Sequence, residues 1–153
     1  MMKHAADLMS ALLFATLLVA PTGQVAADPT SDEATASAVA TAWLGLVDAG
    51  NYAAAWARLH PQFQATLEQA TWGARLRANR NSVGAIQERR LVGARYASSL
   101  PDAPPGEYVV VQFESRFEHR PELLETIVPM RDTDGQWRVA GHFFAERQQI
   151  PRQ

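Results

Sequence analysis

The chain has 153 residues, no cysteine, and 14 basic against 16 acidic side chains, so its net charge at neutral pH is -2. This length predicts about one domain. A near-neutral charge disfavours a dedicated nucleic-acid-binding protein. The absence of cysteine excludes a disulfide framework, a thiolate zinc site and a cysteine nucleophile.

Residues 1–27 are typical of a secretory signal peptide. An apolar run from Leu8 to Ala20 follows a basic start, and Val25-Ala26-Ala27 supplies small residues for cleavage after Ala27. The run is shorter than the roughly 20 apolar residues that a membrane-spanning helix needs. We therefore expect an exported protein, periplasmic or extracellular, with no transmembrane span after cleavage. The alternative is an uncleaved amino-terminal anchor.

Helical signals fill the first half of the remaining chain. Thr30-Ser31-Asp32-Glu33 has the pattern of a capping box, and Gly50 ends the helix that follows it. Asn51 is expected to cap a second helix, which ends before Pro61, and Thr71 to cap a later one. The tryptophans fit core positions rather than a ligand site; they are Trp43, Trp56, Trp72 and Trp137.

The second half of the chain alternates with the period of strands. We predict strands over Ile86–Ser98, Tyr108–Phe117, Leu123–Met130 and Trp137–Phe144, joined in series by turns and loops. The fold class is therefore α+β, with N-terminal helices packed on a curved four-stranded antiparallel sheet. Residues 28–148 form the single domain, and residues 149–153 form a polar tail.

The strand register decides which polar side chains meet. If Phe117 pairs with Leu124 across the turn, Arg116 lies opposite Glu125 on the polar face of the sheet, and His142 faces Glu125 or Ile127. A glutamate that orients a histidine beside an arginine has the composition of an acid–base dyad. The alternative is a solvated sheet face with ordinary cross-strand ion pairs.

Three residues are the candidates for acid–base chemistry: Asp48, Glu114 and His142. Asp48 also fits ordinary turn chemistry before Gly50. His60 is expected at the carboxyl end of a helix, where an imidazolium complements the helix dipole. His119 lies in a charged turn, but no motif has the spacing of a metal site, so we expect no metal and no cofactor.

One stretch of the chain is locally basic. Its arginines are candidates for binding an anionic ligand or envelope partner; they are Arg75, Arg77, Arg80, Arg89, Arg90 and Arg95. The structural alternative is that some favour a helix end and that others protect an edge strand from pairing.

Several short blocks resemble one protein family. They include Ala42-Trp43-Leu44, Tyr52-Ala53-Ala54-Ala55-Trp56, Glu107–Phe113 and the specific block Trp137-Arg138-Val139-Ala140-Gly141. In these blocks the chain resembles the small exported bacterial proteins grouped as domain of unknown function 4019. The resemblance implies a fold similar to that of nuclear transport factor 2, with helices on a curved sheet. It implies no catalytic or binding residues.

These observations favour an exported binding or accessory module of the cell envelope, with an unidentified envelope partner or a small anionic ligand. One alternative is a small pocket enzyme that uses carboxylate or histidine chemistry. Another is a self-associating module, such as a homodimer through the sheet, because Leu123, Ile127 and Phe144 are expected to put apolar area on its outer face.

Overall fold

The computed structural model describes residues 28–147, in which four helices precede four strands. The predicted signal peptide lies outside these residues, as does the predicted tail. The helices are α1 (Pro29–Asp48), α2 (Tyr52–Ala57), α3 (Pro61–Gln64) and α4 (Gln69–Val83). The strands are β1 (Ile86–Ala97), β2 (Tyr108–Phe117), β3 (Leu123–Arg131) and β4 (Trp137–Glu146).

Helix α1 begins two residues earlier than a Thr30 cap requires. Asp28 is the N-cap, and its side chain accepts a hydrogen bond from the Thr30 backbone N–H at 3.2 Å. Pro29 suits the first helical position because it has no N–H to leave unpaired. The predicted capping box is therefore wrong, and the Glu33 carboxylate instead accepts from the backbone N–H of Tyr96 in β1.

The short helices confirm one predicted cap and correct two other expectations. The Asn51 side chain caps α2 by accepting from the Ala54 N–H, as predicted. His60 caps the start of α3 rather than the end of α2, because its Nδ1 accepts from the Gln62 N–H at 3.2 Å. Helix α4 begins at Gln69, so Thr71 lies inside the helix and does not cap it.

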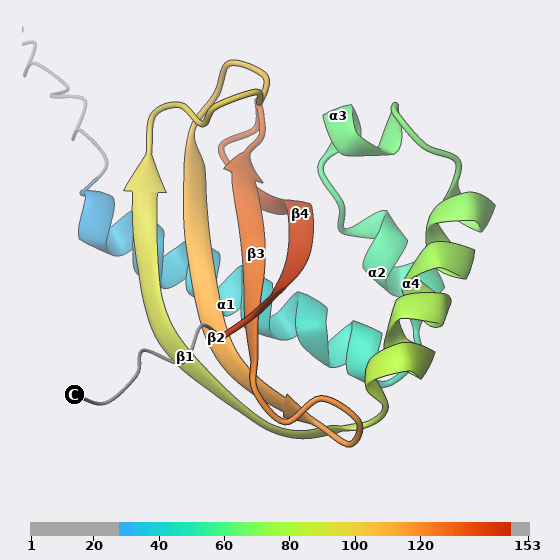
Figure 1. Cartoon of the computed structure of the whole chain (residues 1–153). Helices are drawn as coiled ribbons and strands as arrows, with labels where there is room; N and C mark the ends of the chain where they lie inside the picture. Colours follow the sequence, from blue (N-terminus) through green and yellow to red (C-terminus); the bar gives the residue numbers. More distant parts are fainter. Residues whose placement is uncertain (1–27, 148–153) are drawn as a thin grey trace, which may run out of the picture.

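The four strands form one antiparallel sheet in the order β1-β2-β3-β4, as the sequence predicted. Figure 1 shows the strands bending together along their length, so the sheet is curved. The turn before β4 contains Gly135 in the left-handed region, at φ 80°. Each strand therefore lies beside its neighbours in sequence, which leaves β1 and β4 as the edges.

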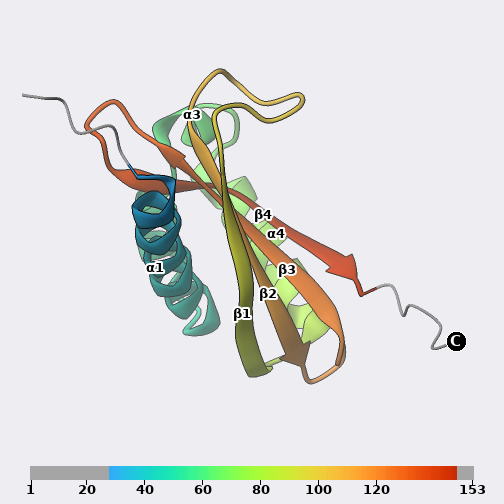
Figure 2. The same cartoon turned by 90° about the vertical axis from the view of Figure 1, so that its left-hand side faces the viewer.

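The helices are placed in two groups around the sheet. Helix α1 crosses one face, as Figure 2 shows, and contacts all four strands. Helices α2, α3 and α4 lie beside the β4 edge (Figure 1), where the His60 N–H donates to the Val139 carbonyl at 2.8 Å. The main core lies between α1 and the sheet and includes Trp43, Leu44, Val111 and Ile127. No helix within residues 28–147 is long and apolar enough to cross a membrane.

Candidate functional site

A glutamate lies at the centre of the covered sheet face. Glu125 alternates with Leu123 and Ile127 on β3, and its side chain is fully buried among them. The observed register pairs Phe113 with Glu125 and Ser115 with Leu123. This differs from the predicted Phe117–Leu124 pairing by an odd number of positions, so every β3 side chain changes face. Glu125 therefore lies in the core and not opposite Arg116 on the solvated face.

Three side chains satisfy the buried Glu125 carboxylate. Ser115 Oγ and Arg89 Nε each donate to Oε2 at 2.7 Å, and His142 Nε2 lies 2.9 Å from Oε1. His142 pairs with Ile127 across the β3–β4 ladder, which was one of its two predicted partners, and it reaches Glu125 diagonally. The predicted glutamate–histidine pair thus exists, but inside the protein and with Arg89 as its arginine.

Arg89 extends this group toward the end of α1. Its Nη1 lies 2.6 Å from Asp48 Oδ2 and its Nη2 lies 3.2 Å from Asp48 Oδ1, while Arg80 from α4 binds the same Oδ1 at 2.7 Å. Two guanidinium groups therefore balance two carboxylates. We call this set the buried ionic network; it comprises Asp48, Arg80, Arg89, Ser115, Glu125 and His142.

The network fixes the charge of its most buried member. Burial alone would raise the pKa of Glu125, but the hydrogen bond with His142 and the charge of Arg89 outweigh it and lower the pKa to about 2. Burial likewise opposes the charge of Arg89, yet the bonds to Asp48 and Glu125 raise its pKa above the ordinary value. Glu125 is consequently an anion at every physiological pH.

An ionised Glu125 determines the tautomer of His142. A carboxylate only accepts hydrogen bonds, so Nε2 carries the proton and, in the neutral ring, Nδ1 keeps a free lone pair. Within residues 28–147, Nδ1 has no hydrogen-bond partner. The ring also meets Trp43 edge-on, with the centroids 5.4 Å apart. His142 is therefore held from two sides with one nitrogen available.

His142 lines a cleft of about 240 Å³ between α4 and the β4 edge, which we call the α4–β4 cleft. Aromatic and aliphatic side chains form most of its wall: Trp43, Leu59, Phe63, Leu67, Trp72, Leu76, Val139 and Phe143. Its polar side chains are Arg75 and Asn79, one helical turn apart on α4, and His142. The cleft therefore combines an apolar wall with a few fixed polar groups.

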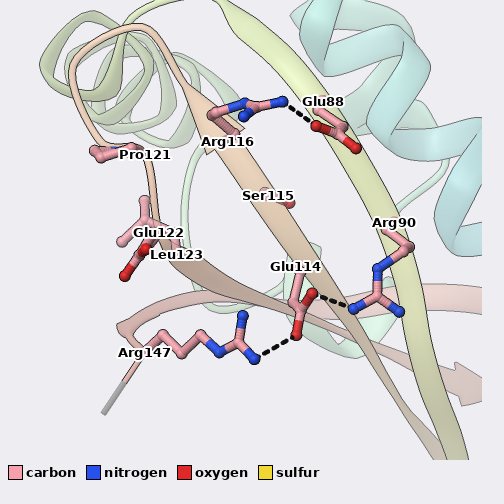
Figure 3. Close-up of a pocket in the computed structure, with 9 residues that line it drawn as sticks. All are labelled: Glu88, Arg90, Glu114, Ser115, Arg116, Pro121, Glu122, Leu123 and Arg147. Atoms are coloured by element: carbon pink, nitrogen blue, oxygen red, sulfur yellow. Dashed lines mark hydrogen bonds and ion pairs between the residues drawn. The ribbon is translucent and has the colours of Figure 1, made fainter. Parts of the chain in front are cut away.

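The other acid–base candidates occupy different places. Asp48 belongs to the buried ionic network, where two arginines hold its carboxylate, and it does not line the α4–β4 cleft. Glu114 lies on the uncovered sheet face, as Figure 3 shows, where it bridges Arg90 and Arg147. The structure therefore brings Asp48 and His142 into one network and leaves Glu114 outside it.

The uncovered face shown in Figure 3 carries balanced charges. Beside the Glu114 bridge, Arg116 pairs with Glu88 across β1 and β2. These side chains are largely exposed, so each pair contributes at most about 1 kcal/mol. The depression on this face therefore has the character of a solvated ion-pair ladder, and its arginines have no surplus charge for an anion.

The six candidate arginines do not share one surface. Arg80 and Arg89 point into the buried ionic network, whereas Arg90 lies on the uncovered face. Arg95 is also exposed on that face, where β1 pairs it with Val110. Arg77 stacks over the Tyr52 ring at 5.5 Å, in a depression separate from the α4–β4 cleft. Arg75 is exposed, lines the cleft and forms no ion pair within residues 28–147.

The expected apolar patch on the outer sheet face is also corrected. Leu123 and Ile127 are buried at 6% and 0% exposure, and the Phe144 ring packs edge-on against Phe117, 5.6 Å between centroids. The same change of register that moved Glu125 inward accounts for this. Phe143, which no pattern singled out, is instead 60% exposed on the outer face.

Sequence reasoning missed Arg89, Ser115 and Glu125 as one group. Arg89 appeared only as part of a basic stretch, although β1 pairs it directly with Ser115. The alternation of β3 gives no signal for Glu125, since apolar residues lie on both faces of the strand: Leu123 and Ile127 on one, Leu124 and Val128 on the other. No cluster of three or more histidine or acidic side chains in the described part of the chain is arranged to hold a metal ion.

Comparison with known proteins places the chain in one family. The model of the family described as "Protein of unknown function (DUF4019)" matches residues 39–142, which contain the second half of α1, the other helices and the sheet through His142. Neither the curated proteins nor the solved structures gave a match. Because the family model covers more than half of the chain, including every residue of the buried ionic network, the protein belongs to the DUF4019 family.

Proposed function

We propose that the protein is an exported binding module of the cell envelope that takes a small, largely apolar ligand into the α4–β4 cleft. One observation carries the proposal: an aromatic-walled cleft contains an imidazole that a buried carboxylate holds in place. Ligand sites are commonly concave, mostly apolar and supplied with a few fixed polar groups. The signal-peptide pattern of residues 1–27 supports export.

The rigidity of the polar groups supports binding. Glu125 fixes His142 from behind, and Arg89 and Ser115 fix Glu125, so a ligand would not have to order the imidazole itself. Preorganisation of this kind lowers the entropic cost of association. The proposal includes a fold similar to that of nuclear transport factor 2, in which helices cover a curved sheet.

Equilibrium dialysis with 2-naphthoate tests the proposal, because this probe joins a flat apolar body to one carboxylate. Asn79→Phe fills the mouth of the cleft from an exposed position and is expected to lower the affinity at least tenfold. Asn81→Phe adds the same ring two residues along α4, outside the cleft, and is expected to leave the affinity unchanged. Equal affinities of the two variants, or no binding by the native protein, would contradict the proposal.

A second candidate function is acid–base catalysis by His142. The Glu125–His142 pair favours it, since the carboxylate fixes Nε2–H and leaves Nδ1 of this cleft-lining ring as a proton acceptor. A binding module returns its ligand unchanged, whereas a catalyst converts it. Mass spectrometry of a ligand after prolonged incubation with native protein and with His142→Gln separates the two: conversion by the native protein alone supports catalysis.

A further inference from the structure

A second cavity adjoins the α4–β4 cleft. It has a volume of about 480 Å³ and lies between α3, the loop of residues 100–104, the start of β2, the end of β3 and the middle of β4. Its wall is mainly apolar, with Phe63, Tyr108, Val128, Met130 and Phe143 among its side chains. We call it the α3–loop cavity.

The two cavities meet at the β4 edge. They share Phe63, Ala140, Gly141 and Phe143 as lining residues. His142 points to the helix-covered face, whereas Gly141 pairs with Val128 on the opposite face. A ligand that occupied both would therefore bend around the edge of the sheet, which a flexible chain does and a rigid ring system does not.

Volume and polarity favour one ligand across both cavities. The α4–β4 cleft alone is smaller than the roughly 300–1,000 Å³ of usual small-molecule sites, so a ligand of usual size with its head in this cleft would extend into the adjoining α3–loop cavity. Arg75 is the single charged side chain that lines the cleft, and within residues 28–147 it has no ion-pair partner. Asp102 is the charged side chain at the α3–loop cavity. This difference in charge between the two cavities favours a negative head group at Arg75 and an apolar tail in the α3–loop cavity.

Phe143 adds an independent observation. It is the most exposed of the large apolar side chains in the described part of the chain, and it lies where the two cavities meet. A Cβ atom placed on Gly141 would come within 2.7 Å of the Phe143 ring, so that ring covers the glycine. An apolar chain that passed from one cavity to the other would contact the exposed side of this ring.

We propose that the ligand is a single-chain amphiphile, with its anionic head at Arg75, Asn79 and His142 and its acyl chain running over the Phe143 ring into the α3–loop cavity. This inference rests on the proposed binding function and names its ligand class. A free fatty acid and a single-chain phospholipid share the required chemistry.

Isothermal titration of the protein with octanoate, decanoate and dodecanoate tests the route of the chain. Each added methylene is expected to raise the affinity about fourfold, because its burial is worth about 0.8 kcal/mol. Gly141→Leu displaces the exposed Phe143 ring, over which the chain is proposed to run, and is expected to abolish this gain. Ala145→Leu, on the same strand and face but outside both cavities, is expected to retain it.

Two arginines of α4 test where the head group binds. Arg75→Gln is expected to weaken dodecanoate binding roughly tenfold, through loss of a charge-assisted hydrogen bond, and Arg77→Gln to leave it unchanged. Dodecyltrimethylammonium is expected to bind more weakly than dodecanoate. Dodecanoate and 1-dodecanoyl-glycerol-3-phosphate serve as the two sources of the chain, and tighter binding of either one supports the proposal and identifies the source.

The outcomes separate this inference from the proposed function. If 2-naphthoate binds in the cleft but the alkanoates show no dependence on chain length, the amphiphile inference is wrong and the binding function stands. The same holds if Gly141→Leu and Ala145→Leu give equal chain-length gains. If neither 2-naphthoate nor any alkanoate binds, both proposals fail.

Discussion

His142 Nε2 lies 2.9 Å from Glu125 Oε1, inside the protein and next to a cleft. This pair connects the ion pairs that stabilise the fold with the surface that we propose for ligand binding. Behind Glu125 are Arg89 and Asp48, and in front of His142 is open volume. The consequences for stability and for binding are therefore separable by substitution.

Glu125→Gln is expected to destabilise the protein by about 3–5 kcal/mol, because it removes one partner of a buried ion pair. Glu114→Gln is the matched control on the neighbouring strand and is expected to cost no more than about 1 kcal/mol, since its arginines are exposed. Urea unfolding monitored by circular dichroism measures both. Similar losses for the two variants would show that the buried position of Glu125 has no special importance.

The depressed pKa of Glu125 predicts a loss of stability in acid. A carboxyl whose pKa is about 2 in the folded state and about 4.5 when unfolded stabilises the fold above pH 4.5. That contribution, about 3 kcal/mol, is lost as the pH falls from 4.5 to 2, because the unfolded state takes up the proton first. Urea midpoints at pH 6, 4.5 and 3 are expected to fall less steeply for Glu125→Gln than for the native protein. Parallel profiles would count against the assigned role of this carboxyl.

Arg89→Lys tests whether the network depends on geometry or on charge alone. A guanidinium binds Asp48 and Glu125 together, and a single ammonium lacks the planar fork that does so. We expect a loss of about 1–3 kcal/mol, as when a hydrogen bond to a buried charged group is removed. Arg90→Lys, at the next residue and on the uncovered face, is expected to be neutral. Thermal melts of the two variants check this, and an unchanged melting temperature for Arg89→Lys would contradict it.

Export gives a prediction about the amino terminus. If cleavage follows Ala27, the mature protein begins at Asp28, the residue that caps α1. Intact-mass spectrometry of the protein recovered from the envelope or the medium determines the first residue. Recovery of the full chain with residues 1–27 would instead support the uncleaved anchor.

The sequence predicted the elements of the fold better than the contacts of the site. Tyr108–Phe117 was correct as a strand because its apolar residues alternate without interruption. The β2–β3 register was wrong because the turn after Phe117 is tighter than the assumed one: the backbones of Phe117 and Arg120 exchange hydrogen bonds. Nothing in the alternation of β3 alone says which face is buried. A strand with Glu125 between two apolar residues is equally consistent with Glu125 in the core and with Glu125 in a cross-strand ion pair on the solvated face.

Contacts between residues far apart in the sequence account for the rest of what the sequence could not predict. Asp48 and Arg80 meet across the fold from α1 and α4, and Arg89 joins them from β1. Local periodicity places each residue on its own element, but the helix–sheet packing determines which charged groups meet. The α4–β4 cleft depends on the same packing, so only its individual residues, such as His142, were identifiable beforehand.

The central claim is that the α4–β4 cleft binds a ligand. The most direct measurement is an NMR titration of isotope-labelled protein with 2-naphthoate, observing backbone amides and the tryptophan indole groups. The account predicts that the largest shifts cluster at Trp72, Gly141 and His142, which line the cleft. Shifts confined to the uncovered face around Glu114, or no saturable shifts at all, would contradict it.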